Sequence, residues 1–348
     1  MSGARAEVET ITIYGRQISL HNETKPVDFL KLNPQNPRIR HEYYLGDNIP
    51  SEQELESIMW DMDATKRLYR SILVSEGIQN PLYIKASGLV VEGARRTVVV
   101  RKMKENLDTG SFSEQESKVV RRVVNNIPVK ILPDDISEKE IDILLAREHI
   151  SGKYPWPAVN QAEHIYRMYQ LDGFPIQTIA ETIERSRPWV YQKLGAFTWT
   201  REYLRRNDHG KLTDYSFFEE LYKKKGALKR IADFDADDDE NRRYFEELVS
   251  DGKIPMAIQV RKLPEILADP EAKTILEKDG YEKAYSVLIS KDPSLGSSAF
   301  KKIADAIQAL LTMPRNEYFE IASDDAKQKL IIRLQKEIQN ILDELNIT

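Results

Sequence analysis

The sequence of 348 residues contains no cysteine. This absence excludes disulfides, a cysteine nucleophile and thiolate metal sites. The five histidines show no His-x-x-x-His spacing, so the sequence gives little support to a histidine-rich metal site. There is also no apolar run of about 18 residues and no charged-then-apolar leader. We therefore expect a protein without a membrane span, located by default in the cytoplasm.

Charges of the two signs nearly balance, with 51 Lys or Arg against 56 Asp or Glu and a formal net charge of −5. This balance argues against a chain that coats nucleic acid along its whole length, but it allows a local basic face. The length predicts two or three domains, each large enough to bury a core of its own.

The first 150 residues are predicted to mix short strands with helices. Residues 1–25 are expected to form an arm with one strand in ITIYGRQISL, followed by an extended turn segment in LKLNPQNPRIR. Helical spacing over residues 51–76 ends at Gly77, and NPLYIKASGLVVEG is typical of a hairpin. A strand in VVNNIPVKIL precedes a helix that opens at Ser137. After Pro157, helices are predicted to the end of the sequence.

The stretch VVEGARR leaves a predicted strand through Gly93 and places Arg95 and Arg96 at the start of a helix. Glycine lets a backbone approach a ligand closely, and arginines beside helix N-terminal amides bind phosphate. A tight turn with solvated arginines gives the same pattern, so the motif alone leaves both interpretations open.

Five short pieces follow one another in order: LNPQNPR, a helix ending in SEGIQNPLYI, VVEGARR, IPVKIL, and a helix ending in AREHI. This order resembles the N-terminal domain of ParB-like partition proteins, whose fold is shared with sulfiredoxin. The resemblance covers about residues 30–204. It implies a domain that binds CTP with magnesium, where the nucleotide gates a clamp that slides on DNA.

The resemblance carries over to particular residues of a cofactor site. Matching or neighbouring positions are Gly93, Arg95, Arg96, Glu148 and Lys153.

Three positions depart from the family pattern. Ala94 stands where the family has an acidic residue, His149 replaces an asparagine, and Gly152 stands at an arginine position. A methyl group provides neither a base nor a metal ligand. We therefore expect no catalytic residue and weak or absent CTP hydrolysis, and the metal ligands stay unknown.

The second motif is FPIQTIAETIERSRPWVYQKLGAF, residues 174–197, which is typical of a helix-turn-helix. From Arg185 to Arg230 there are 12 Lys or Arg against 5 Asp or Glu. Two packed surface helices are the alternative. The predicted base-edge contacts are Arg187, Tyr191 and Gln192, and the predicted phosphate contacts are Arg185, Ser186 and Lys193.

Near the C-terminus, apolar residues recur at spacings of 3 and 4, at Ile331, Leu334, Ile338, Ile341 and Leu345. This spacing fits about two heptads of a coiled-coil seam between two copies of the chain. An amphipathic helix packed on its own domain is the alternative. The resemblance favours a homodimer, because the family usually dimerises through its C-terminal region.

The predicted fold class is an α+β N-terminal domain, ParB/sulfiredoxin-like, followed by an all-α helix-turn-helix and helical C-terminal domains. The expected domains are an arm (1–25), the nucleotide-binding domain (26–155), the DNA-binding domain (156–230) and a helical C-terminal domain (231–348). The leading hypothesis is a site-specific double-stranded-DNA-binding protein of the partition or nucleoid-associated type, gated by CTP, with a partner ATPase as a further implied partner. Two alternatives stay open: a transcriptional regulator without nucleotide, and a CTPase or nuclease.

Overall fold

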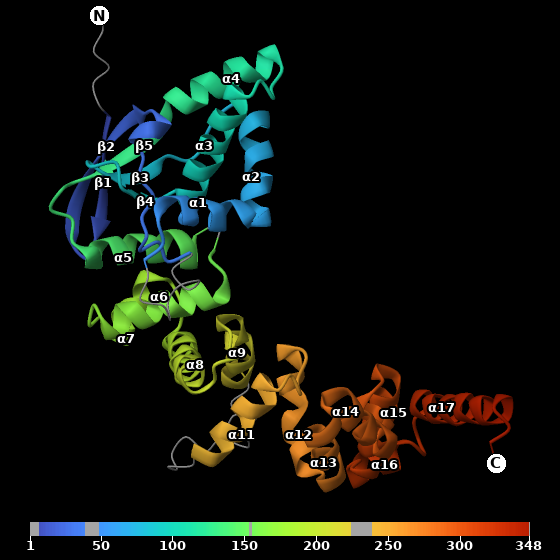
Figure 1. Ribbon diagram of the computed structural model, residues 1–348. Coiled ribbons are helices and arrows are strands. Elements are labelled where there is room, and N and C mark those ends of the chain that lie inside the picture. Colours follow the sequence, from blue (N-terminus) through green and yellow to red (C-terminus); the bar gives the residue numbers. More distant parts are fainter. Residues whose placement is uncertain (1–6, 39–48, 153–154, 224–238, 348) are drawn as a thin grey trace, which may run out of the picture. The chain divides into compact units, whose positions relative to one another are not determined.

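The computed structural model of the protein describes residues 7–38, 49–152, 155–223 and 239–347 (Figure 1). The chain divides into two compact units. One is Met1–Asp251 with Met256–Arg261, and the other is Gly252–Pro255 with Lys262–Thr348. The domain boundaries expected at residues 25, 155 and 230 stay predictions.

Five strands of the first unit form one mixed sheet, in the order β1-β2-β5-β3-β4. β3 and β5 run parallel, whereas the other neighbouring strands pair antiparallel. The strands are β1 (Glu7–Ile13), β2 (Arg16–Lys25), β3 (Leu82–Lys85), β4 (Val90–Glu92) and β5 (Ile127–Leu132).

The sequence predicted the β3–β4 hairpin and β5, but the single strand expected in residues 11–20 is wrong. The chain reverses at Tyr14 and Gly15, whose φ angles are 49° and 80°, and so makes two strands. Positive φ at both central residues is the geometry of a two-residue hairpin turn. The first 25 residues therefore contribute two strands to the sheet.

Helices pack on both faces of this sheet. Because side chains alternate along a strand, Leu82 and Ile84 of β3 join one apolar cluster and Tyr83 joins the other. The first cluster is completed by α1 (Glu52–Asp61), α2 (Asp63–Val74), α3 (Ala94–Asp108) and α4 (Glu114–Asn125), with the short η1 (Val27–Phe29). The second is completed by α5 (Glu138–Ala146), the π-helix η3 (Arg147–Ser151), α6 (Ala158–Gln170), α7 (Ile176–Thr182) and α8 (Arg187–Arg206).

The predicted start of α5 is confirmed. Ser137 accepts a hydrogen bond from the backbone N–H of Glu140, and the Glu140 carboxylate accepts one from the Ser137 backbone N–H. This reciprocal capping satisfies two backbone donors that a helix start otherwise leaves unpaired. The cap fixes where α5 begins. Because η3 continues directly from the end of α5, it also helps to fix the position of the η3 side chains.

An aromatic core packs the second half of α8 against the elements that follow it in the first unit. Trp199, Phe218 and Phe245 pack with ring centroids 5.2 to 5.6 Å apart. The buried Glu246 accepts hydrogen bonds from Trp199 Nε1 and from Arg206. The remaining elements here are η4 (Leu212–Asp214), α9 (Tyr215–Lys223), α11 (Asp239–Ser250) and η5 (Ala257–Lys262).

The second unit is helical. Its buried hydrophobic residues are Ile254 and residues of α12 (Leu263–Ala268), α13 (Pro270–Asp279) and α14 (Tyr281–Lys291), which precede η6 (Pro293–Leu295). No described residue of α15 (Ser298–Leu311), α16 (Arg315–Glu320) or α17 (Asp325–Glu344) is buried. The α+β-then-helical fold class is therefore confirmed. Among the described residues, no helix is both long enough and apolar enough to cross a bilayer.

A buried group of charges joins α5 to α6 in the first unit. Arg167 Nε donates to Asp142 Oδ2 at 2.5 Å, and His164 Nε2 lies 2.8 Å from the Asp142 carbonyl oxygen. Burial, and then the neighbouring Asp142 carboxylate, raise the pKa of Asp172 to about 6. Two carboxylates this close are most stable when they share one proton.

This pKa generates a prediction about stability. The folded protein binds a proton at Asp172 more tightly than the unfolded chain, so the free energy of unfolding falls as pH rises from about 4 to about 6. Asp172→Asn removes the repulsion. We expect it to raise Tm at about pH 7.5, by roughly 2–4 °C per kcal/mol gained, and to have little effect near pH 4. Thermal melts at both pH values test this, with the exposed Asp134→Asn as control, and an equal gain at both would contradict it.

Candidate functional site

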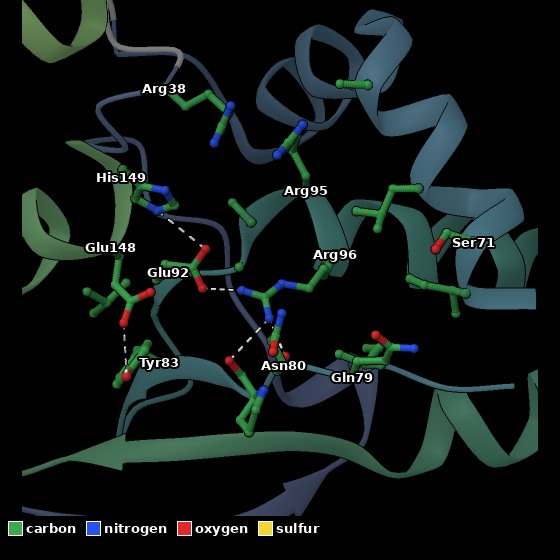
Figure 2. Close-up of a pocket in the computed structure, with 18 of the residues that line it drawn as sticks. Arg38, Ser71, Gln79, Asn80, Tyr83, Glu92, Arg95, Arg96, Glu148 and His149 are labelled. Atoms are coloured by element: carbon green, nitrogen blue, oxygen red, sulfur yellow. Dashed lines mark hydrogen bonds and ion pairs between the residues drawn. The ribbon is translucent and has the colours of Figure 1, made fainter. Parts of the chain in front are cut away.

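The first unit contains a cavity of about 870 Å³ at the end of β4, between α2, α3 and η3. Its wall comes from six separate stretches of the chain, including the turn before residue 39 and the loop between α2 and β3 (Figure 2). Five cationic side chains and two carboxylates line it, an excess of three positive charges: Arg38, Arg67, Arg95, Arg96, Lys130, Glu92 and Glu148.

Gly93 stands at the start of α3 with φ of 108°. A side chain is strained there, and a Cβ would lie 2.4 Å from Leu82 Cγ of β3. The glycine is thus required by the backbone conformation and by packing against β3. The phosphate role predicted for Gly93 stays a prediction.

Arg96 and Arg95 differ in their surroundings, although the sequence treats them alike. Arg96 donates hydrogen bonds to the Asn80 carbonyl, to the Pro81 carbonyl at 3.2 Å and to the Glu92 carboxylate. It therefore ties the loop before β3 to the end of β4. A phosphate contact by Arg96 stays a prediction, and it would compete with these partners.

Arg95 faces a residue that the sequence analysis missed, Arg38 (Figure 2). Both guanidinium groups are half-buried, and neither has a hydrogen-bond or ion-pair partner within the part of the chain that the structure describes. Burial, and then the charge of Arg95, lower the pKa of Arg38 to about 10. Arg38 is the last residue of the LNPQNPR motif, and that was the signal available in the sequence.

Helix α6 holds the segment that presents Arg38. Asn160 Nδ2 donates to the carbonyl oxygens of Pro37 at 2.8 Å and of Arg38 at 3.2 Å. The Asn36 side chain also accepts from the Arg38 backbone N–H at 2.9 Å. These bonds fix the Arg38 backbone, so its side chain projects into the cavity from an anchored base.

Glu92 and His149 form the inner wall of the cavity. His149 Nε2 lies 3.4 Å from one Glu92 carboxylate oxygen, and Arg96 binds the other. Burial alone would raise the pKa of Glu92, but the hydrogen bond from His149 and the charge of Arg96 outweigh it and hold that pKa below its usual value. The His149 ring stacks on Trp156 with centroids 4.5 Å apart, so the network extends toward α6.

Of the remaining predicted cofactor residues, Glu148 accepts a hydrogen bond from the Tyr83 hydroxyl at 3.4 Å. Gly152 packs so tightly that a Cβ would lie 2.0 Å from the Glu148 carbonyl oxygen, which leaves no room for the arginine of the family pattern. Lys153 lies outside the described residues. Across the described ranges there is no group of three or more His, Asp or Glu side chains that would hold a metal ion.

The opposite side of the cavity has a different character. Ser71 and Gln79 lie away from Arg38 and His149 in Figure 2. Apolar side chains of α2 and the following loop complete that side, together with a second hydroxyl: Leu68, Ile72, Ile78 and Ser75. The cavity therefore has one cationic side and one mixed apolar and hydroxyl side.

The predicted DNA-contacting residues lie at the turn between α7 and α8. Glu184 adopts a φ of 52°, the conformation for which this turn often uses glycine. Ser186 caps α8 by accepting a hydrogen bond from the Trp189 backbone N–H at 3.4 Å. Four of the predicted contact residues are exposed: Arg185, Ser186, Arg187 and Tyr191. A fifth, Gln192, is half-buried.

Lys193 was predicted to reach phosphate, and the structure places it elsewhere. Its side chain is buried, donates to the Glu219 carboxylate of α9, and lies 5.9 Å from the Tyr215 ring centroid. A lysine held between helices cannot extend to a phosphate at the surface, so we remove it from the candidate contacts. Trp189 is half-buried with Arg185 5.7 Å from its ring centroid, as expected for a packing residue.

Comparison with protein-family models and with curated proteins gives no match. Among solved structures, the chain is similar to C-terminally truncated ParB of Caulobacter crescentus complexed to the centromeric parS site, at 13% identity and a TM-score of 0.33, over 70% of this chain and 98% of that one. It is similar to a Pnob8-like ParB-N domain at 12% identity and a TM-score of 0.41, over 76% and 98%. A third similar structure is the Caulobacter crescentus protein complexed with CTP-gamma-S, at 15% identity and a TM-score of 0.21, over 58% and 97%.

All three structures are of ParB or its N-terminal domain. These similarities assign no function, ligand or partner to this chain.

Replacing Arg95 and replacing Arg96 should have different effects on the free energy of unfolding. Arg96→Ala leaves the Asn80 and Pro81 carbonyls and one of the two Glu92 carboxylate oxygens without a donor, so we expect a loss of about 1–3 kcal/mol in the free energy of unfolding. Arg95→Ala removes a cation that faces Arg38, so we expect an unchanged or higher free energy of unfolding. Urea unfolding of both variants is the measurement, and equal losses would contradict the distinction.

Proposed function

We propose that this protein is a site-specific DNA-binding protein of the ParB-like partition or nucleoid-associated type, and that the cavity of its first unit binds CTP. The observation that carries the proposal is a shared core. Trp156 and Tyr83, which line the cavity, pack in the same apolar cluster as Ile179 of α7 and Val190 of α8. An occupant of the cavity and a DNA molecule at α8 would therefore act on one packed body.

DNA binding is assigned to the exposed start of α8. Arg187 and Tyr191 are the side chains proposed to reach base edges, with Gln192 beside them, and Arg185 and Ser186 are proposed to contact phosphates. A helix that presents its N-terminal turn to the major groove, and is braced by a preceding helix, is the usual helix-turn-helix arrangement. The exposed arginines on either side of Ser186 support this proposal.

Nucleotide binding is assigned to the cavity because its two sides match the two parts of a nucleotide. The guanidinium groups of Arg38 and Arg95 suit phosphates, and the mixed side with Ser71 and Gln79 suits a base and sugar. A volume of about 870 Å³ lies within the range of roughly 300–1,000 Å³ usual for small-molecule sites. CTP is preferred over other nucleotides on the sequence resemblance.

An active CTPase or nuclease is the less favoured candidate. The Ala94 methyl group lines the cavity where the family has its acidic residue, and Glu92 is already bound by Arg96 and His149. We therefore propose weak or no hydrolysis. A DNA-binding regulator that uses no nucleotide is the remaining alternative, and absence of CTP binding would favour it.

Self-association is assigned to the C-terminal helices. Along α17, the predicted seam residues Leu334, Ile338 and Ile341 are 38%, 48% and 53% exposed. α15 exposes Phe300, Ile303, Ile307 and Leu310 at the same spacings of 3 and 4. Such stripes are normally covered by a partner, and we propose a second copy of this chain. A partner ATPase is proposed from the resemblance alone.

The base-reading role of Arg187 is tested by Arg187→Ala. A bidentate arginine–base contact carries about 1–3 kcal/mol of discrimination, so we expect binding to a selected site to weaken by about 10-fold or more and binding to random DNA to weaken less. Wild-type protein first selects its site from a random-sequence library, and affinities are then measured at fixed salt. Arg121→Ala, an exposed arginine on α4, is the matched control. Equal losses on both DNAs would reduce Arg187 to a phosphate contact.

Dimerisation is tested by deleting the chain from Ala326 onward. We expect a monomer by light scattering where the full chain is a dimer. In the full chain, Ile338→Asp should also give a monomer, because a buried carboxylate without a partner is costly, whereas Lys336→Asp on the same helix should not. A truncated protein that stays dimeric would show that α17 is not the interface.

A further inference from the structure

We infer that the cavity binds the anionic groups of its ligand through Arg38 and Arg95 without a divalent cation. The inference rests on the proposed nucleotide binding and departs from the magnesium that the family resemblance implies. It follows from how the charged side chains of this chain are already paired.

The first observation is an unusual pair of cations. Arg38 and Arg95 face each other, half-buried, and neither forms a hydrogen bond or an ion pair with a carboxylate within the described ranges (Figure 2). Burial is the largest effect on both groups and lowers the pKa of each. The charge of Arg95 lowers the pKa of Arg38 further, the charge of Arg96 does the same for Arg95, and the single carboxylate of Glu92 offsets only part of this. Like charges that are partly removed from water are stabilised by an anion between them. The site is thus short of negative charge before any ligand enters.

The second observation is that Glu92, the carboxylate nearest these arginines, is occupied. One of its oxygens accepts from Arg96, and the other lies 3.4 Å from His149. A divalent cation at Glu92 would sit beside the Arg96 guanidinium and would have to displace one of these donors. Arg96 would then also lose part of its bonding to the loop before β3.

The third observation concerns the neighbouring ligand positions. Ala94 offers a methyl group, and His149 offers an imidazole whose Nδ1 is buried without a hydrogen-bond partner in the described chain. Mg²⁺ prefers oxygen ligands in near-octahedral geometry, so neither side chain suits it. Glu148 provides one carboxylate and is itself bonded to Tyr83 at 3.4 Å. The residues present therefore do not fit magnesium.

With the metal's charge replaced by two fixed guanidinium groups, ligand affinity should depend on those arginines and on salt, and not on Mg²⁺. The test is calorimetric titration of the full-length protein with CTP, once with Mg²⁺ in excess and once with EDTA. We expect dissociation constants that agree within about threefold, since a lost charge-assisted contact would change affinity by about tenfold or more.

Three variants complete the experiment. Arg38→Ala and Arg95→Ala should each weaken CTP binding about tenfold or more, in both buffers, with unchanged Tm. Arg121→Ala, an exposed arginine on α4, should have no effect. Titration with inorganic triphosphate in EDTA separates the phosphate contacts from those to the base, and should respond to the same two arginines.

The outcomes are distinguishable. CTP binding that requires Mg²⁺ overturns the metal-free site and leaves the proposed nucleotide binding in place. Absence of binding by CTP and triphosphate in both buffers overturns both. Metal-independent binding that survives both arginine changes would move the phosphate site elsewhere in the chain and so also overturn the inference.

Discussion

The carboxylate of Glu92 is the point on which the candidate site depends. Through Arg96 it joins the end of β4 to the start of α3 and to the loop before β3, and through His149 it joins the π-helix η3. A half-buried carboxylate is stable there only because two donors share it. The same bonds occupy both oxygens of Glu92, so Arg95 has no ion pair among the described residues and contributes to the cationic side of the cavity.

Helix α6 connects this cavity to the helices that follow. Its Asn160 holds the backbone that presents Arg38, and Trp156, just before α6, stacks on His149. The other faces of the same helix pack in the core that also contains residues of α7 and α8. The cationic side chains of the cavity and the exposed start of α8 are therefore parts of one packed unit, which is the structural basis for proposing one function for both.

Motif order and periodicity predicted much of this arrangement. The capping box at Ser137, the β3–β4 hairpin and β5 follow from local chemistry and were predicted correctly. The strand pair in residues 7–25 was missed because only Gly15 signals its turn, and the residue before it, Tyr14, is of a type that seldom adopts the positive φ required there. Lys193 was misjudged for another reason: its burial depends on Glu219, which lies on a different helix.

The sequence by itself determined the fold class and the placing of Gly93 at a strand end with two arginines at the start of the next helix. These features depend on local backbone chemistry and on the order of neighbouring residues. Tertiary structure alone decided which arginine is free. Arg96 finds carbonyl partners at Asn80 and Pro81, 16 and 15 residues away, while Arg95 is turned toward Arg38, from a motif that lies far earlier in the chain. Pairing of charges is set by distances in space, and a sequence does not contain those distances.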